Sequence, residues 1–371
     1  MRAFSWILVG VLSGLAGCSS CSSTSGTGAA KEDLQLVPKE TDVVFMANVT
    51  RMRDTALWRR VLDLRDSQPS VKKDYDEFVT KCALDPLKQI DSVFLAFPES
   101  VGQSKEFAAI LRGTFNEAKL VECATEQAKK DNQELAVSEY GGHKLYTSTK
   151  QGQAFASFLD AKTVVLGGKE WIKKTIDLAA GKKEAGPSAK ENETLMALIK
   201  RAKISAGLWG VGVVPQSARD QLKNDPNFAS AASMKDVFGN IDLASGFLAD
   251  LNVDLGSPAD AVELSKKIGD QIAEARKNPQ FMMAGLNSFL ESVKVEAVQS
   301  TFHVNVTFNQ QQVDDLINRV QGLLSSFRGA LGGSMGGAPP SMPPQGMPAP
   351  EPTPAPTTPT PAPAPKPAPA H

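Results

Sequence analysis

The stretch TDVVFMANV, residues 41–49, decides the fold class, because its apolar side chains alternate along the chain. Val43, Phe45, Ala47 and Val49 would share one side of an extended backbone, and two of the three residues between them are also apolar. A period of two residues indicates a β-strand. Similar patterns predict further strands in the first half of the chain, at residues 91–97, 106–114, 143–148, 154–159 and 163–166.

Helices are predicted where apolar residues recur with a period of 3.6. One apolar stripe follows Asn309, which suits the N-cap position, and comprises Val313, Leu316, Ile317, Val320, Leu324 and Phe327. A second stripe follows the pair Ser257-Pro258, an N-cap and a first-turn proline, and comprises Ala261, Leu264, Ile268, Ile272 and Ala275.

The order of elements runs twice along the chain. A strand at 43–49, helices, two strands and a helix at 117–130 are matched by a strand at 205–214, a helix at 216–223, two strands and a helix at 259–276. Hairpin-length connections between strands favour antiparallel sheets. We therefore expect an α+β fold of two related sub-domains, with mainly antiparallel sheets and amphipathic helices packed on one face. The expected boundaries are 1–17 signal peptide, 18–33 flexible tether, 34–203 first half, 204–328 second half and 329–371 disordered tail.

The N-terminus is typical of an exported protein. Arg2 precedes an apolar run that is shorter than the roughly 20 residues needed to span a bilayer. The sequence Leu15-Ala16-Gly17-Cys18 then resembles the lipobox of bacterial lipoproteins. That resemblance implies lipidation of Cys18, cleavage before it and, with Ser19 next, sorting to the outer membrane. The alternative, that Cys18 and Cys21 form a redox or metal pair, is disfavoured because residues 19–30 are mostly Ser, Thr, Gly and Ala.

The segment LVPKETDVVFMANVTRMRDTALWRRV, residues 36–61, resembles the opening of a group of lipoproteins from gliding, predatory Gram-negative bacteria. A second landmark is DPLKQIDSVFLAF at residues 85–97. The group has no established activity, so the resemblance implies a class of protein and a location only.

Composition narrows the choice of partners. The chain is 42% hydrophobic and 22% charged, with a net charge of −1, and thus lacks the basic surface that nucleic acid requires. Its end is rich in proline, with 15 of the 24 prolines between Pro339 and Pro369, and favours extended polyproline II. This tail is either a spacer or docking strap, or a solubilising tail without a partner. The expected partners are the membrane, through the lipid anchor, and an unknown envelope protein or cell-wall component.

No catalytic, cofactor-binding or metal-binding residues are predicted. The three histidines, His143, His303 and His371, are expected to be exposed on the surface. The G-x-S-x-G match at residues 332–336 and the S-x-x-K match at residues 70–73 lack the context their chemistry needs. A carboxylate pair of the glycosidase type stays open. Trp209, flanked by glycines, is assigned to the core, with a pocket wall as the alternative.

Cys82 and Cys123 are predicted to form a disulfide. Export would place both thiols in an oxidising compartment, and helices that flank adjacent strands would bring them together. The alternative is two buried, unpaired thiols that act as small hydrophobic residues.

The sequence as a whole predicts an envelope-anchored lipoprotein with a non-catalytic binding or structural role. An envelope hydrolase that uses unidentified carboxylates and a carrier of an apolar envelope molecule are the alternatives. A cleft with convergent titratable groups would favour the hydrolase, whereas an apolar site would favour the carrier.

Overall fold

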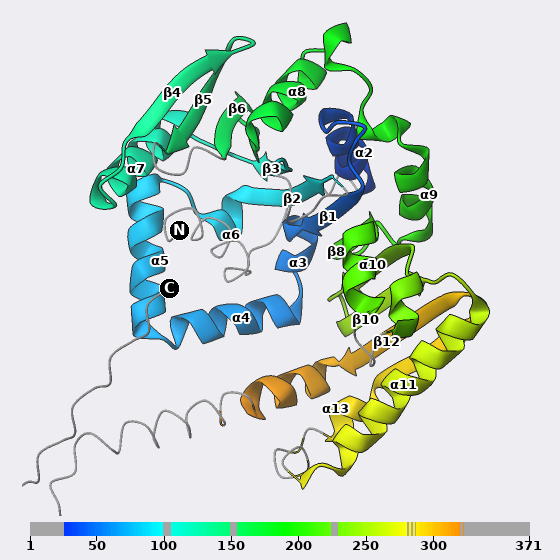
Figure 1. The fold of residues 1–371 in the computed structure, drawn as a ribbon. Coiled ribbons are helices and arrows are strands. Elements are labelled where there is room, and N and C mark those ends of the chain that lie inside the picture. The colour runs from blue at the N-terminus through cyan, green and yellow to red at the C-terminus, as the bar shows by residue number, and fades with distance from the viewer. Residues whose placement is uncertain are drawn as a thin grey trace, which may run out of the picture. The chain divides into compact units, whose positions relative to one another are not determined.

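The structure is a computed structural model that describes residues 26–98, 105–148, 154–223, 229–279 and 287–319, together with 282, 285 and 322 (Figure 1). All of these residues belong to one compact unit. The lipobox and the proline-rich tail lie outside the described residues.

The strands form one 12-stranded sheet, in which every pair of neighbours is antiparallel. The order across the sheet is β11-β12-β10-β9-β8-β1-β2-β3-β7-β6-β5-β4. The predicted α+β class is thus confirmed. The strands are Val43–Asn48 (β1), Ile90–Phe97 (β2), Ala108–Gly113 (β3), Leu135–Tyr140 (β4), His143–Ser148 (β5), Phe155–Asp160 (β6), Thr163–Gly167 (β7), Leu208–Val213 (β8), Asp236–Asp242 (β9), Gly246–Asp254 (β10), Val293–Val298 (β11) and Thr301–Asn309 (β12).

The strand order repeats about the centre of the sheet, where β1 pairs with β8. Outward from β1 the next strands are β2, β3, β7 and β6, and outward from β8 they are β9, β10, β12 and β11. In each run the last two strands occur in the reverse of their chain order, and the β4–β5 hairpin is an addition to the first run. The strands predicted at 43–49 and 205–214 therefore hold equivalent positions, and both halves contribute to a single sheet.

One face of the sheet, called here the Met46 face, is covered near its centre by α2 (Gly26–Leu36), α8 (Lys169–Ala179) and α9 (Glu193–Arg201). These helices bury apolar side chains against β1, β2, β3 and β8. The buried set includes Leu34, Ile172, Ile176, Leu195 and Leu198 from the helices, and Val44, Met46, Phe94, Ile110 and Trp209 from the strands.

The opposite face, called the Phe45 face, carries α3 (Val49–Arg53), α4 (Ala56–Asp66) and α7 (Glu117–Lys130) over the first half and α11 (Pro258–Lys277) over the second. Helices thus pack on both faces, whereas the sequence predicted one, because the central strands are apolar on both sides. Further helices are α5 (Pro69–Cys82), α6 (Pro86–Gln89), α10 (Gln216–Lys223) and α13 (Asn287–Glu291), and residues 310–319 are also helical. Short 3-10 turns lie at Lys183–Ala185, Ala189–Glu191 and Ala229–Ser233.

Helix α2 corrects the predicted tether, which was expected to extend to residue 33. Its residues Ala30 and Leu34 are at most 2% exposed, and Asp33 is fully buried. Composition alone favours a flexible segment here, but burial against the sheet stabilises a helix that would be marginal in isolation.

Candidate functional site

A row of apolar residues, with two adjacent glycines between Leu251 and Phe45, crosses the Phe45 face from one edge of the sheet to the other. Each strand contributes one residue, and each residue pairs in register with the next. We call this set the apolar row: Val295, Val304, Leu251, Gly239, Gly210, Phe45, Leu95, Ala109, Leu166, Ala156, Tyr146 and Val137. Apart from the Tyr146 hydroxyl, which donates to Glu117 Oε1 at 2.6 Å, the row offers no polar side-chain atom.

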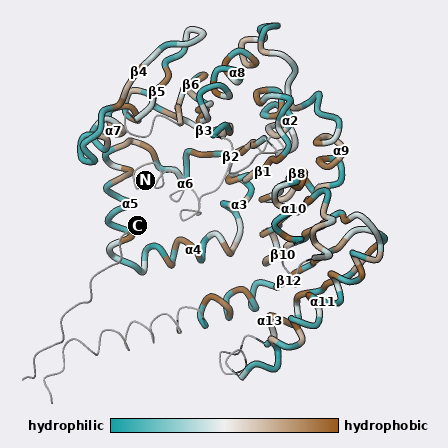
Figure 2. Tube along the Cα trace, in the orientation of Figure 1, coloured by the Kyte–Doolittle hydropathy of each residue, from teal (hydrophilic) through white to brown (hydrophobic). Residues whose placement is uncertain are grey.

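The apolar row is only partly covered by helices. Phe45 is 50% exposed although it lies on a central strand, and Leu251 is 43% exposed. Figure 2 shows that β1 and β2 are mostly hydrophobic at this position in the fold. Contiguous exposed apolar area marks a binding surface more often than isolated side chains do, and beside Phe45 this area is continued by its aromatic neighbours.

Aromatic rings extend the exposed region beside Phe45. The ring of Phe97 lies edge-on to Phe45 with 6.5 Å between centroids and stacks on Phe107 at 6.4 Å. Gly210 makes room for this arrangement, because a Cβ there would lie 2.6 Å from Phe45 Cδ1. The Phe45 ring therefore leans over the neighbouring strand β8.

The glycines around Trp209 serve the same packing. Trp209 itself is 3% exposed in the core of the Met46 face, so the core assignment is confirmed. Cβ atoms at Gly207 and Gly212 would lie 3.0 Å from side-chain atoms of Met52 and Val43. The space that these glycines leave is thus filled by side chains of this chain.

His303 lies on the Met46 face of β12 but is not freely exposed, in contrast to the prediction. Its Nε2 is 2.9 Å from Asp250 Oδ2 and its Nδ1 is 2.8 Å from Glu296 Oε1. Burial opposes protonation, but the two carboxylates outweigh it and raise the pKa of His303. With both ring nitrogens occupied, the imidazole links β10, β12 and β11 and has no nitrogen left to act as a base.

His143 is likewise half-buried rather than exposed, with Nδ1 3.0 Å from the Phe158 carbonyl oxygen. It borders a pocket of about 310 Å³ that is also lined by Glu32, Arg112, Asp160 and Thr163. His371 lies outside the described residues.

Beside this pocket, Asp33 of α2 forms a buried ion pair with Arg112 of β3. Arg112 Nε and Nη2 donate to Asp33 Oδ1 at 2.8 and 2.7 Å, and Nη1 donates to Thr163 Oγ1 at 3.0 Å. Burial raises the pKa of Asp33 to about 6, against the opposing effect of Arg112. Because the Asp33 side chain is 0% exposed, it fastens α2 to the sheet and cannot reach a substrate.

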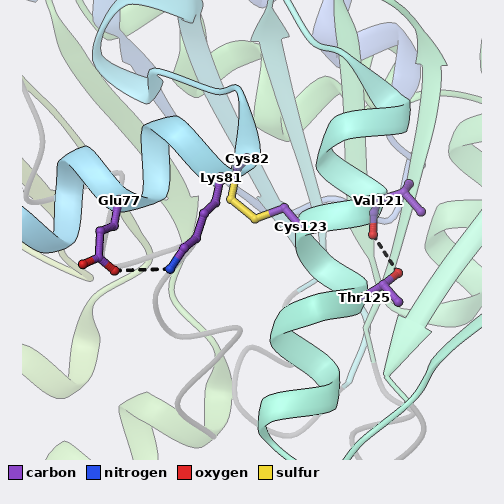
Figure 3. The surroundings of a disulfide bond; sticks show 6 residues. All are labelled: Glu77, Lys81, Cys82, Val121, Cys123 and Thr125. Atoms are coloured by element: carbon purple, nitrogen blue, oxygen red, sulfur yellow. Dashed lines mark hydrogen bonds and ion pairs between the residues drawn. A yellow bond between two sulfur atoms is a disulfide. The ribbon is translucent and has the colours of Figure 1, made fainter.

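The two cysteines paired by the sequence prediction, Cys82 and Cys123, form a disulfide that joins the end of α5 to α7 (Figure 3). Their Cα atoms are 5.0 Å apart. Cys18 and Cys21 lie outside the described residues, as does the G-x-S-x-G match. The S-x-x-K match falls within α5 on an exposed surface.

Two further properties concern the described residues alone. Among them, no group of three or more His, Cys, Asp or Glu side chains could hold a metal ion. Within the same ranges, none of the helices is both long and apolar enough to cross a membrane.

Comparison with known proteins yields distant similarity of fold only. No protein-family model matches the chain, and no curated protein matches it. Crystal forms I, III and IV of TP0453 are similar to 76% of this chain, with TM-scores of 0.40, 0.41 and 0.40 and sequence identities of 15%, 15% and 12%. The similarity covers 95%, 96% and 95% of those chains.

Proposed function

We propose that this chain is a lipoprotein anchored in the outer membrane through Cys18, and that its folded part binds an apolar molecule at the apolar row without catalysis. The observation that carries the proposal is Phe45, which is 50% exposed on a central strand and is surrounded by apolar neighbours in register. Exposed apolar area of this kind is stabilised when a ligand removes it from water.

The shape of the row suggests the ligand. From Leu251 to Leu95 the row crosses consecutive strands β10, β9, β8, β1 and β2. At about 4.8 Å per strand this stretch is roughly 19 Å long. A long, narrow and apolar surface suits an extended acyl chain better than a compact polar metabolite.

A non-catalytic role is supported by the state of two titratable sites. Asp33 is buried against Arg112, and both nitrogens of His303 contact carboxylates. Groups held in this way stabilise structure, and a general base would need a free lone pair within reach of substrate.

The test uses the full chain in mild detergent and a fluorescent apolar probe, N-phenyl-1-naphthylamine. Phe45→Ser should weaken probe binding roughly fivefold, because covering the exposed half of a phenylalanine contributes about 1 kcal/mol. The control is Val298→Ser, which removes a similarly exposed side chain, 55% exposed, from the Met46 face of the same sheet.

The control variant should bind the probe as the unaltered protein does. If the unaltered protein does not bind the probe, the proposal is refuted. Equal effects of the two substitutions would also refute it, because the binding would then not depend on the apolar row.

A further inference from the structure

The two edges of the sheet are formed by β4 and β11. In the part of the chain that the structure describes, neither strand pairs with another on its outer side. An open edge presents unpaired backbone N–H and C=O groups and can accept another strand. The side chains on each edge decide which strand would fit.

Strand β11, with the sequence VKVEAV, has two chemically different sides. Lys294, Glu296 and Val298 are exposed on the Met46 face, and Val293, Val295 and Ala297 lie half-buried on the Phe45 face under α11. The alternation of a lysine and a glutamate on one face makes this edge complementary to itself.

We propose that two copies of this chain associate by antiparallel pairing of their β11 strands, with Val295 on the two-fold axis. In this register Lys294 lies opposite Glu296 of the second copy, and the converse pair forms by symmetry. Val293 lies opposite Ala297, and Val295 lies opposite itself. Opposite charges that face each other directly on neighbouring strands stabilise the pairing.

The register follows from charge. Pairing that keeps the Met46 faces of both copies on one side shifts in steps of two between opposed positions. Only two such registers pair five residues of β11 with the second copy, one with Val295 on the axis and one with Glu296 on the axis. The second places Glu296 opposite Glu296 and is destabilising. The register with Val295 on the axis keeps the long pairing and opposes no like charges.

The other edge lacks this property. Strand β4, LAVSEY, carries a single charged residue, Glu139, so no register of β4 with itself forms an ion pair. The pairing of β11 also extends the apolar row through Val295 into the second copy, although the association does not depend on any ligand of that row.

Disulfide trapping tests the axis. The full chain carries Cys21→Ser, which leaves Cys82 and Cys123 bridged to each other, and receives one new cysteine. Val295→Cys should be trapped as a covalent dimer under mild oxidation, because directly opposite residues have Cα atoms about 4.5–5.5 Å apart. Val298→Cys tests the register, since it lies three residues from the axis, and Val137→Cys tests the other edge.

Neither control should be trapped efficiently. A monomeric Val295→Cys protein on a non-reducing gel would overturn the proposal. Equal trapping at Val298→Cys or Val137→Cys would overturn it as well, because the contact would then lack the stated register or edge.

Charge reversal tests the ion pairs, with the monomer–dimer equilibrium of the full chain in detergent followed by analytical ultracentrifugation. Lys294→Glu should weaken dimerisation about tenfold, since two attractive pairs become repulsive. Adding Glu296→Lys should restore dimerisation in part, because this substitution also removes the contact of Glu296 with His303. Lys162→Glu, the same charge change in the β6–β7 turn, should have no effect. If Lys294→Glu dimerises as the unaltered protein does, the register is wrong.

Discussion

Removing the disulfide, by Cys82→Ala together with Cys123→Ala, should release α5 from the fold. Within α5 the only buried residue is Cys82. Its other side chains are at most half-buried, among them Phe78, Val79 and Tyr75, whose hydroxyl donates to Asp85 Oδ1 at 2.5 Å. The covalent bond to α7 therefore carries much of the attachment that apolar burial supplies for the other helices.

The size of the effect follows from the loop that the bond closes. The two cysteines are 41 residues apart, and the chain-entropy relation gives about 4 kcal/mol for a loop of that length. The relation describes the fully unfolded chain, so about 4 kcal/mol is an upper limit for detachment of α5 alone. At 1.4 kcal/mol for each factor of ten, the equilibrium for detachment should rise by at most roughly 1,000-fold.

Hydrogen exchange measured by mass spectrometry distinguishes local release from general loss of stability. Peptides from Pro69–Cys82 should lose most of their protection in the double variant. Peptides from the central strand Ile90–Phe97 should lose less, because core strands exchange only when the whole fold opens. Lys81→Ala is the control, since it removes the exposed ion pair with Glu77, at 3.2 Å, and leaves the disulfide intact. Such a pair contributes about 0.5 kcal/mol or less.

Two results would contradict the reasoning. If α5 stays as protected as in the unaltered protein, its packing holds it without the bond. If β2 loses protection as much as α5 does, the disulfide stabilises the whole fold and not the attachment of one helix.

Three further predictions concern the anchor and two charged sites. Cys18→Ala should leave an unprocessed precursor that lacks the lipid, and Cys21→Ala should change neither processing nor detergent partitioning; an acylated Cys18→Ala product would contradict the lipobox assignment. Because the pKa of His303 is raised in the folded state, protonated His303 contributes stability that is present below about pH 6.5 and is lost as the pH rises through the folded value. The urea midpoint of the unaltered protein should therefore fall over this pH range, and His303→Gln should abolish that part of the fall. An unchanged pH profile in the variant would count against the ion triad. The pKa of Asp33 is raised from 3.8 to about 6 in the folded state, so protonated Asp33 contributes stability below pH 3.8 that is lost as the pH rises through 6. Asp33→Asn should remove this loss, which is about 3 kcal/mol at 1.36 kcal/mol per unit. Urea unfolding at pH 4 and pH 7 checks this, and the same pH dependence in both proteins would contradict it.

Local elements could be predicted from the sequence because they depend on short-range patterns. The predicted strand 143–148 and the helices 117–130 and 216–223 coincide with β5, α7 and α10. The predicted N-cap at Ser257 also occurs, since its hydroxyl accepts from the backbone N–H of Asp260 at 3.2 Å. Such features involve residues a few positions apart, so their physical cause is present in the sequence itself.

Helix α2 was missed for the opposite reason. Its first residues are small and polar and carry no helical period, and it forms because Leu34 and Val37 are buried against the sheet. The partner of Asp33 is Arg112, 79 residues further along the chain. Neither fact can be seen before the helix is placed on its face of the sheet.

The candidate site shows the same limit. The sequence determined that Phe45 and Leu251 lie on strands, and that each strand has an apolar side. Only the tertiary structure decided that β8 pairs with β1, which sets the register between the two halves and aligns Gly210 with Phe45. Register between distant strands depends on which apolar faces are buried together, so the apolar row, the carboxylates around His303 and the free edge of β11 exist only in the assembled sheet.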